Sequence, residues 1–160
     1  MDKILSRRSL LLASSLLLLT AACAGPPQIP VSPDAPPFTL EGFFTGRTVG
    51  KGAFTSPIAG VNRPLTVITT GRWDGETLTL REDFVFADGE KDVKTWRFRK
   101  IGHGVYSGTR EDVIGEAVVR QVGNTVQLTY TADVRGKDGS VTRLDFADTI
   151  APLDRRRVLN

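Results

Sequence analysis

The sequence predicts an all-β domain made of consecutive antiparallel strands, and three observations support this class. From Phe38 onward the apolar residues recur with a period of two, the repeat of a strand with one buried face. Glycine, Asp-Gly and Gly-Asn recur at short intervals, and these residues suit tight hairpins because they tolerate positive φ. No segment after residue 22 combines a helical period with end caps.

The clearest strand covers residues 125–134, where Val126, Leu128 and Tyr130 lie on one side and Gln127 and Thr129 on the other. The same alternation recurs along the rest of the domain, in segments separated by the turn signals. In chain order, the candidate strands are 48–54, 64–70, 76–86, 93–100, 104–108, 113–121, 125–134 and 141–150. The turn signals lie at 71–75, 88–89, 102–104, 123–124 and 137–139.

Links this short make consecutive strands antiparallel neighbours. A meander of about eight strands, each with one apolar face, buries those faces best by closing into an up-and-down barrel or a tightly curled sheet. Such a barrel is either filled by side chains or holds one small apolar ligand. A two-sheet sandwich is the structural alternative.

Residues 1–22 have the pattern of a secretory signal peptide. A basic segment, 1–8, precedes an apolar run at 9–19, and small residues follow up to Cys23. The apolar run is about half of the ~20 residues that a membrane-spanning helix needs. The pair Arg7-Arg8 also resembles the twin-arginine export motif, so general secretion and twin-arginine export both stay open.

Cys23 is the single cysteine of the chain, which excludes an intramolecular disulfide. Residues 19–23 (LTAAC) resemble a lipobox, in which acyl chains such as palmitate anchor the protein through the cysteine. An ordinary signal peptide with an incidental cysteine is the alternative. Lipidation predicts a periplasm-facing, lipid-anchored protein of the cell envelope. Ala24 stands where an aspartate would signal inner-membrane retention, which favours the outer membrane.

Residues 23–37 are predicted to form a tether. Six prolines fall within residues 24–37, and such a stretch favours an extended polyproline conformation. At about 3.1 Å per residue, it would hold the domain up to ~40 Å from the bilayer. The predicted organisation is therefore signal peptide 1–22, lipidated cysteine and tether 23–37, and β domain 38–160.

The charge balance argues against nucleic acid as a partner. The formal charge is +3, but Lys3, Arg7 and Arg8 outweigh Asp2 by two charges within the leader alone. A nearly neutral mature chain lacks the basic face that nucleic-acid binding demands.

No familiar catalytic motif is present. His103, the single histidine, lies in the glycine-flanked turn 102–104, a poor platform for a catalytic triad and a typical place for a solvated residue. With Cys23 lipidated, no Cys/His metal cluster can form. Neither a phosphate-binding glycine loop nor a nucleophile elbow occurs. We expect a protein that is not an enzyme and needs no cofactor or metal.

Charged residues on apolar strand faces are the best candidates for a ligand site. The alternation places Glu82 on the same strand face as Leu80 and Phe84, and Asp148 on the same face as Phe146. A charged side chain on the inner face of a barrel destabilises the fold unless it is paired with an opposite charge or hydrated. Arg97 and Arg99, which flank Phe98 next to Trp96, could point into the same interior. Trp73 and Trp96 could line the mouth of a cavity, although a tryptophan in a strand is more often a core residue. The predicted ligand-binding set is Glu82, Arg97, Arg99, Asp148, Trp73 and Trp96. A β-bulge or a position at the barrel mouth is the alternative explanation for the carboxylates.

Most of the mature chain resembles a family of small proteobacterial lipoproteins catalogued as domain of unknown function 3833. The matching segments are 43–46 (FFTG), 71–75 (GRWDG), 78–84 (LTLREDF), 88–90 (DGE), 95–96 (TW), 106–109 (YSGT) and 112–115 (DVIG). The resemblance implies a lipocalin-like barrel in the cell envelope and no known activity. Family members continue past the segment resembling 157–160, so either this chain is truncated at Asn160 or its sheet stays open at the C-terminal edge.

Three functions follow from these observations. The leading hypothesis is a membrane-anchored lipoprotein that binds a lipid or small apolar molecule in its barrel. The second is an interaction or scaffolding lipoprotein with a filled barrel, an unknown protein partner and no ligand. A hydrolase or isomerase using Glu82 or Asp148 is the least favoured.

Overall fold

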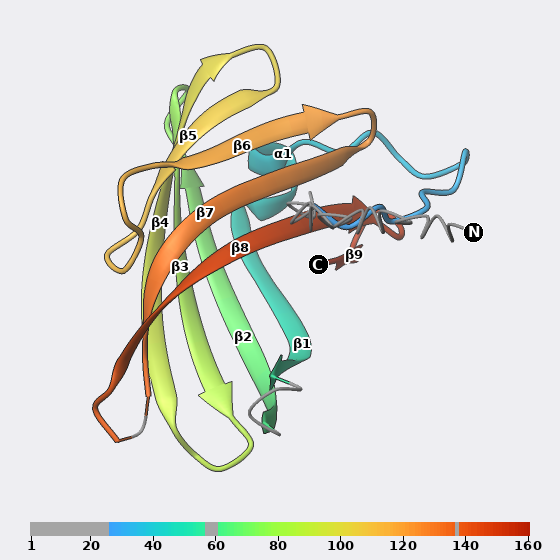
Figure 1. The fold of residues 1–160 in the computed structure, drawn as a ribbon. Coiled ribbons are helices and arrows are strands. Elements are labelled where there is room, and N and C mark those ends of the chain that lie inside the picture. The colour runs from blue at the N-terminus through green and yellow to red at the C-terminus, as the bar shows by residue number, and fades with distance from the viewer. Residues whose placement is uncertain (1–25, 57–60, 137) are drawn as a thin grey trace, which may run out of the picture.

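The computed structural model describes residues 26–56, 61–136 and 138–160, which form a single antiparallel sheet curled into a half-barrel (Figure 1). The predicted signal peptide, Cys23 and Ala24 lie outside the described residues. The strands are β1 (Gly46–Ser56), β2 (Val61–Trp73), β3 (Thr77–Phe86), β4 (Lys91–Gly102), β5 (Val105–Thr109), β6 (Ala117–Val122), β7 (Thr125–Arg135), β8 (Val141–Pro152) and β9 (Val158–Leu159).

Each strand pairs with the next one in the chain, from β1 to β9, so the predicted all-β meander is confirmed. Each of the eight strands predicted from the sequence overlaps one observed strand. The predicted strand 113–121 is shorter than expected: β6 begins at Ala117, and Val113 forms only an isolated bridge with Ala132. The ninth strand, β9, has two residues and was not predicted.

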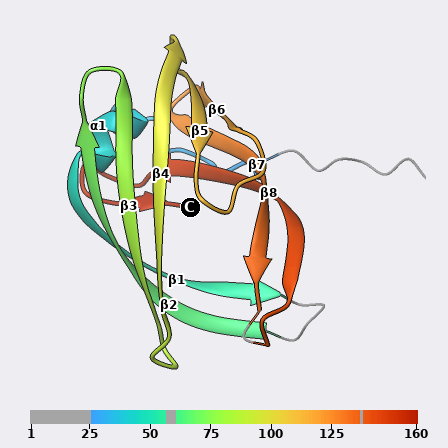
Figure 2. The ribbon, with the colours of Figure 1, turned by 90° about the vertical axis from the view of Figure 1, so that its left-hand side faces the viewer.

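The barrel does not close, and the sheet stays open between β1 and β9. Figure 2 shows β1 and β2 bending round toward the side of β7 and β8 without joining them. The concave side of β1 consists of Gly46, Thr48, Gly50 and Gly52, because these residues pair with the inward-facing residues of β2. A strand that presents glycine and threonine inward has little apolar surface to bury against β8. This is the physical reason that we give for the open edge.

The hairpin turns lie close to the predicted positions, except that the predicted turn 71–75 overlaps β2, which continues to Trp73 and leaves residues 74–76 as the turn. Gly89 and Gly123 adopt φ values of 87° and 57°, which residues with a side chain rarely adopt. His103 is exposed in the turn between β4 and β5, as expected for a solvated turn residue.

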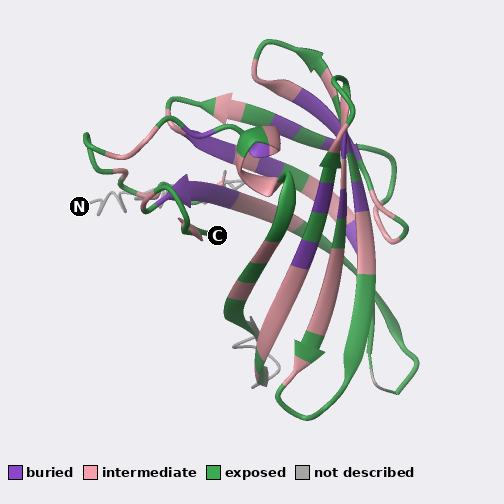
Figure 3. Ribbon diagram, turned by 180° about the vertical axis from the view of Figure 1, so that it is seen from behind, coloured by how far each residue is buried: buried purple, intermediate pink, exposed green. Residues whose placement is uncertain are grey.

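The core occupies one end of the half-barrel, which we call the packed end (Figure 3). There, inward-facing residues of β3 to β8 meet the segment that precedes β1. The buried cluster consists of Phe38, Leu40, Leu78, Leu80, Trp96, Phe98, Tyr106, Ala117, Val119, Val126, Leu128 and Ile150. Burial of this apolar surface is the main stabilising contribution of the fold.

A helix of five residues, α1 (Leu40–Phe44), covers the packed end and was not predicted. Thr39 caps it by accepting a hydrogen bond from the Gly42 amide at 3.1 Å. Glu41 fastens it to the sheet, since its carboxylate accepts hydrogen bonds from Lys100 Nζ at 2.8 Å and from the Tyr106 hydroxyl. Within the described ranges, no helix is long and apolar enough to cross a bilayer.

The proline-rich residues 26–37, predicted as a spacer, are held against the sheet at two points rather than standing clear of it. Thr149 of β8 donates its hydroxyl to the Pro27 carbonyl at 2.5 Å, and Asn124 donates to the Pro36 carbonyl at 2.9 Å. Asn124 also accepts from the Phe38 amide at 2.8 Å, and Gln121 donates to the Phe38 carbonyl at 2.9 Å. Proline carbonyls remain free to accept such bonds, and the donors to them are Thr149 of β8 and Asn124 of the β6–β7 turn.

Candidate functional site

The other end of the concave face is lined by apolar side chains that stay only half-buried, and we call it the open end. Its inward-facing residues are Leu65, Val67, Phe84, Phe86, Tyr130 and Phe146. Figure 3 shows the contrast with the packed end, where the buried positions gather. Tyr130 and Phe146 stack on neighbouring strands with ring centroids 4.9 Å apart. The concave face is therefore divided into a filled half and a half with accessible apolar surface.

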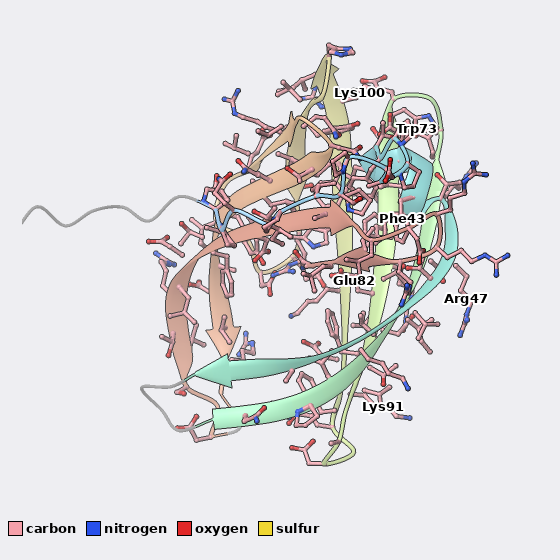
Figure 4. All side chains as sticks on the ribbon, turned by 90° about the vertical axis from the view of Figure 1, so that its right-hand side faces the viewer. Phe43, Arg47, Trp73, Glu82, Lys91 and Lys100 are labelled. Carbon is pink, nitrogen blue, oxygen red and sulfur yellow. The ribbon has the colours of Figure 1, made fainter. Side chains whose placement is uncertain are left out.

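A group of charged residues lies where the two halves meet, and we call it the charged cluster: Glu82, Arg110, Asp112 and Asp148. Glu82 is on β3 opposite Lys94, and Asp148 is on β8 opposite Leu128. Figure 4 shows Glu82 near the middle of the sheet, with Trp73 and Lys100 toward the end that α1 covers. The alternation predicted that both carboxylates point inward, and the register places them on that face.

Arg110 is the centre of the cluster. Its guanidinium carbon lies 4.5 Å from the centre of the Trp96 ring and 5.3 Å from that of Tyr130, a cation–π arrangement. Its Nε donates to Asp112 Oδ1 at 2.6 Å, and its Nη1 lies 3.9 Å from Glu82 Oε2. Its side chain is 11% exposed, so these charges interact in a poorly solvated environment.

The loop 110–116 carries Arg110 and Asp112 into this position. Beyond the end of β5 at Thr109 the loop runs between β4 and β7. It bonds β7 through the Ile114 amide to the Thr131 carbonyl, and through the Asp133 amide to the Asp112 carbonyl. On the other side, Lys94 Nζ of β4 lies 3.3 Å from Asp112 Oδ2. The charged cluster therefore joins two strands that are not direct neighbours in the sheet.

The pKa values of the carboxyl groups in the charged cluster are shifted in opposite directions. Burial raises the pKa of Glu82 to about 7; the Arg110 charge opposes this, and Asp112 and Asp148 add to it. Burial also raises the pKa of Asp148, although a hydrogen bond with Tyr130 and the charge of Arg110 act against it. Burial acts to raise the pKa of Asp112 too, but Arg110 and Lys94 outweigh it and hold that pKa low. The site thus combines a fixed ion pair with carboxyl groups that can keep a proton.

The raised pKa of Glu82 predicts a stability that falls as pH rises. The carboxyl ordinarily titrates near pH 4.5, so between about pH 4.5 and 7 the unfolded chain loses this proton before the folded chain does. The free energy of unfolding should then fall by about 1.4 kcal/mol per pH unit, up to about 3 kcal/mol. Glu82→Gln removes this term. It should be more stable than the parent chain by up to that amount at pH 8 and nearly equal to it at pH 4.5.

Urea unfolding of both proteins from pH 4.5 to 8 measures this difference. Asp83→Asn is the matched control, because Asp83 follows Glu82 on the same strand but pairs with Arg81 on the outer face. Its pH profile should parallel that of the parent chain. Parallel profiles for Glu82→Gln and the parent chain would contradict a buried, proton-binding Glu82.

The structure brings together three of the six predicted ligand-binding residues: Glu82, Asp148 and Trp96. Trp96 is 4% exposed and stacks on Phe98 at 4.9 Å, so it is a core residue as well as the platform for Arg110. Trp73 is half-buried at the end of β2, 6.0 Å from Lys100 Nζ, and packs against the core cluster.

Arg97 and Arg99 do not join the charged cluster. They alternate with the buried Trp96 and Phe98 and are therefore exposed on the convex face. The arginine at the cluster is Arg110, which sequence reasoning missed. Extending the alternation of Tyr106 and Gly108 one step past the end of β5 would have placed Arg110 on the inner face.

Two surface grooves lie apart from Glu82 and Arg110. One of about 360 Å³ separates residues 36–43 from Pro152 and Arg155. The other, of about 410 Å³, is bordered by Ile114, Glu116 and residues of β7 and β8. Among the described residues, no three or more His, Cys, Asp or Glu side chains are placed to hold a metal ion.

Comparison with known families identifies the family of this chain. The model of a family described as protein of unknown function (DUF3833) matches residues 17–160. The chain belongs to the DUF3833 family. The predicted match to domain of unknown function 3833 is thereby confirmed, and the half-barrel is the fold of this DUF3833 chain. No curated protein and no solved structure matches it. The description of the family names no activity.

Proposed function

We propose that this DUF3833 chain is a lipid-anchored protein of the cell envelope whose concave face binds an amphipathic, lipid-like molecule. The observation that carries the proposal is the open end: half-buried aromatic and aliphatic side chains line a concave surface next to a half-buried charged cluster. Soluble domains rarely leave a contiguous group of such side chains accessible unless the surface serves binding. The proposed role is binding rather than catalysis, and His103, the single histidine, is exposed in a turn.

The two parts of the site suit the two parts of an amphipathic ligand. Phe84, Phe86 and the stacked Tyr130–Phe146 pair offer apolar contact to a hydrocarbon chain, worth about 25 cal/mol per Å² of apolar area covered. Arg110 supplies N–H donors, and Glu82 and Asp148 supply acceptors or, when protonated, donors. A polar head group with both donors and acceptors would complement this mixture.

The N-terminal sequence supports the anchor. The basic segment, the apolar run and the small residues before Cys23 match a lipoprotein signal, and acyl chains on Cys23 would keep the protein at a membrane that is itself a source of lipid ligands. We therefore propose a periplasm-facing position, with the outer membrane favoured by Ala24.

Native mass spectrometry of the full chain purified from membranes tests ligand binding. The parent protein should carry a noncovalent, lipid-sized adduct. Phe84→Ser should lose at least ~90% of it, because the removed ring contributes about 2 kcal/mol of apolar contact. Val85→Ser is the matched control: Val85 is the next residue on β3, 38% exposed on the outer face, and should keep the adduct.

Circular dichroism verifies that each variant folds, and Phe86→Ser serves as a second variant if Phe84→Ser does not. A parent protein that carries no adduct, or equal adducts in all variants, would overturn the concave face as a ligand site. The intact mass of the mature chain tests the anchor separately. Acyl groups on Cys23 should disappear, together with membrane retention, in Cys23→Ser.

The second candidate function is protein interaction through β1. Among the described strands, β1 pairs only with β2, so a strand of eleven residues presents a free backbone edge. Such an edge can accept a strand from a partner. Site-specific crosslinking from Val49, which is 52% exposed on β1, would recover a defined protein if this function holds.

A further inference from the structure

The proline-rich segment shortens the distance between the domain and the proposed anchor. The Pro27 carbonyl is bonded to Thr149 near the end of β8, and Asn124 and Gln121 hold Pro36 and Phe38. Only residues 24–26 separate Cys23 from Pro27. A fully extended chain spans at most ~3.6 Å per residue, so a segment of this length can separate the anchor from Pro27 by no more than ~14 Å. A lipid on Cys23 would therefore hold this end of β8 close to the bilayer.

The same end of the molecule carries an exposed basic turn. Residues 153–157 (LDRRR) connect β8 to β9 and form a defined turn, in which the Leu153 amide bonds the Arg157 carbonyl at 2.9 Å. The Asp154 side chain accepts from the amides of Arg156 and Arg157 and pairs with the Arg157 guanidinium at 2.8 Å. Arg155 and Arg156 are exposed. The turn keeps a net charge of +2 once Asp154 is counted against the three arginines.

Apolar residues accompany these charges. Leu153 is 53% exposed and Leu159 is 47% exposed, in the turn and in β9 respectively. The groove of about 360 Å³ lies between Arg155 and Pro152 on one side and Pro37 and Phe43 on the other. Figure 1 shows the turn, β9 and residues 26–38 on the same side of the half-barrel. Arginines beside exposed leucines are the combination that an anionic lipid surface attracts.

We propose that the β8–β9 turn (residues 153–157) and Leu159 form the surface that rests on an anionic bilayer, with the docked segment 26–38 fixing its orientation. The inference rests on the lipid anchor proposed above and is independent of a ligand on the concave face. Arg155 and Arg156 contact the lipid phosphates, and the leucines lie at the level of the head groups. The hairpins β3–β4 and β7–β8 then point away from the membrane.

Fluorescence quenching by lipids tests this orientation. The full chain is matured in cells, purified in its lipidated form and reconstituted into phosphatidylcholine vesicles with or without phosphatidylglycerol. A fluorophore is attached to Leu153→Cys or to Val141→Cys. Both positions are 53% exposed but lie at opposite ends of β8, which makes them a matched pair. Brominated lipids should quench the label at position 153 in the anionic vesicles and leave the label at 141 unquenched.

Replacing both Arg155 and Arg156 with glutamine should return the quenching at position 153 to the level seen in pure phosphatidylcholine. Each arginine near an anionic surface changes the contact equilibrium about five-fold, so the pair accounts for about 25-fold. Equal quenching at both positions, quenching at neither, or an unchanged double variant would overturn the proposed surface.

Two further measurements separate this inference from the proposed function. An intact mass without acyl groups would refute the anchor and, with it, this orientation. A quenched label at position 153 on a protein without a bound lipid would support the surface and refute only the concave-face ligand.

Discussion

Replacing Gly71 with alanine is expected to destabilise the fold by about 3 kcal/mol, near the upper end for overpacking a core. A Cβ atom at this position would lie 1.8 Å from the Phe44 carbonyl oxygen and 3.3 Å from Leu80. The first neighbour is backbone, which cannot rotate aside, so α1 has to leave its place on β2. That movement would also separate Glu41 from Lys100 and Tyr106. Urea unfolding gives the loss directly.

Gly52→Ala is the control for this prediction. Gly52 lies on the same concave face, on β1, and a Cβ atom there meets no atom within 4 Å. Its stability should change by less than about 0.5 kcal/mol, as at other unobstructed sites. Equal stability for the two variants would mean that α1 does not rest on Gly71.

The strands could be predicted because their signals are local. Alternation over a few residues and glycine at the predicted turns indicate where a strand begins and ends, and β3 and β7 agree with the predicted segments to within a residue or so. Helix α1 carries no such signal. A helix of five residues is too short to be stable alone, and contacts from Glu41 to residues about sixty positions away hold it in place.

Closure of the barrel is a long-range property as well. Whether β1 meets β8 depends on how much apolar surface the two edges can bury, and the inward glycines of β1 leave little. The alternation within β1 shows that its inward residues are mostly glycines. Whether this keeps the barrel open depends on β8, a strand nearly a hundred residues away. A closed barrel and a sheet open at its C-terminal edge were both compatible with the local pattern of the sequence.

Only part of the candidate site could be predicted, because only some of its residues lie in regular strands. Alternation gave the inward direction of Glu82 and Asp148, because each lies within a regular strand. Applied strictly, it also places Arg97 and Arg99 outward, since Trp96 and Phe98 are the buried partners. Arg110 lies in a loop, and its position depends on contacts with both β4 and β7. Alternation extended past the end of β5 gives Arg110 its inward direction, but no local pattern specifies its bridge between two strands that are not neighbours.

Arg110→Ala is expected to cost about 3 kcal/mol of folding free energy at pH 8, the size of effect seen when one partner of a buried ion pair is removed. Asp112 would lose the guanidinium at 2.6 Å, and Glu82 would lose the charge that favours its ionised form. The Trp96 and Tyr130 rings would also lose their cation–π partner. Arg99→Ala is the matched control on the convex face and should change stability by less than about 0.5 kcal/mol.

A double-mutant cycle separates lost charge pairing from lost packing. If Arg110 stabilises the ionised Glu82 carboxylate, Arg110→Ala should be less harmful in a Glu82→Gln background, by about 1 kcal/mol at pH 8. At pH 4.5 Glu82 is largely protonated in the folded chain, because burial raises its pKa to about 7, and this coupling should vanish. A coupling that does not change with pH would mean that Arg110 supports the concave face through packing on Trp96 and Tyr130 rather than through Glu82. Asp112, whose Oδ1 accepts from Arg110 Nε at 2.6 Å, would then be the carboxylate that balances the Arg110 charge.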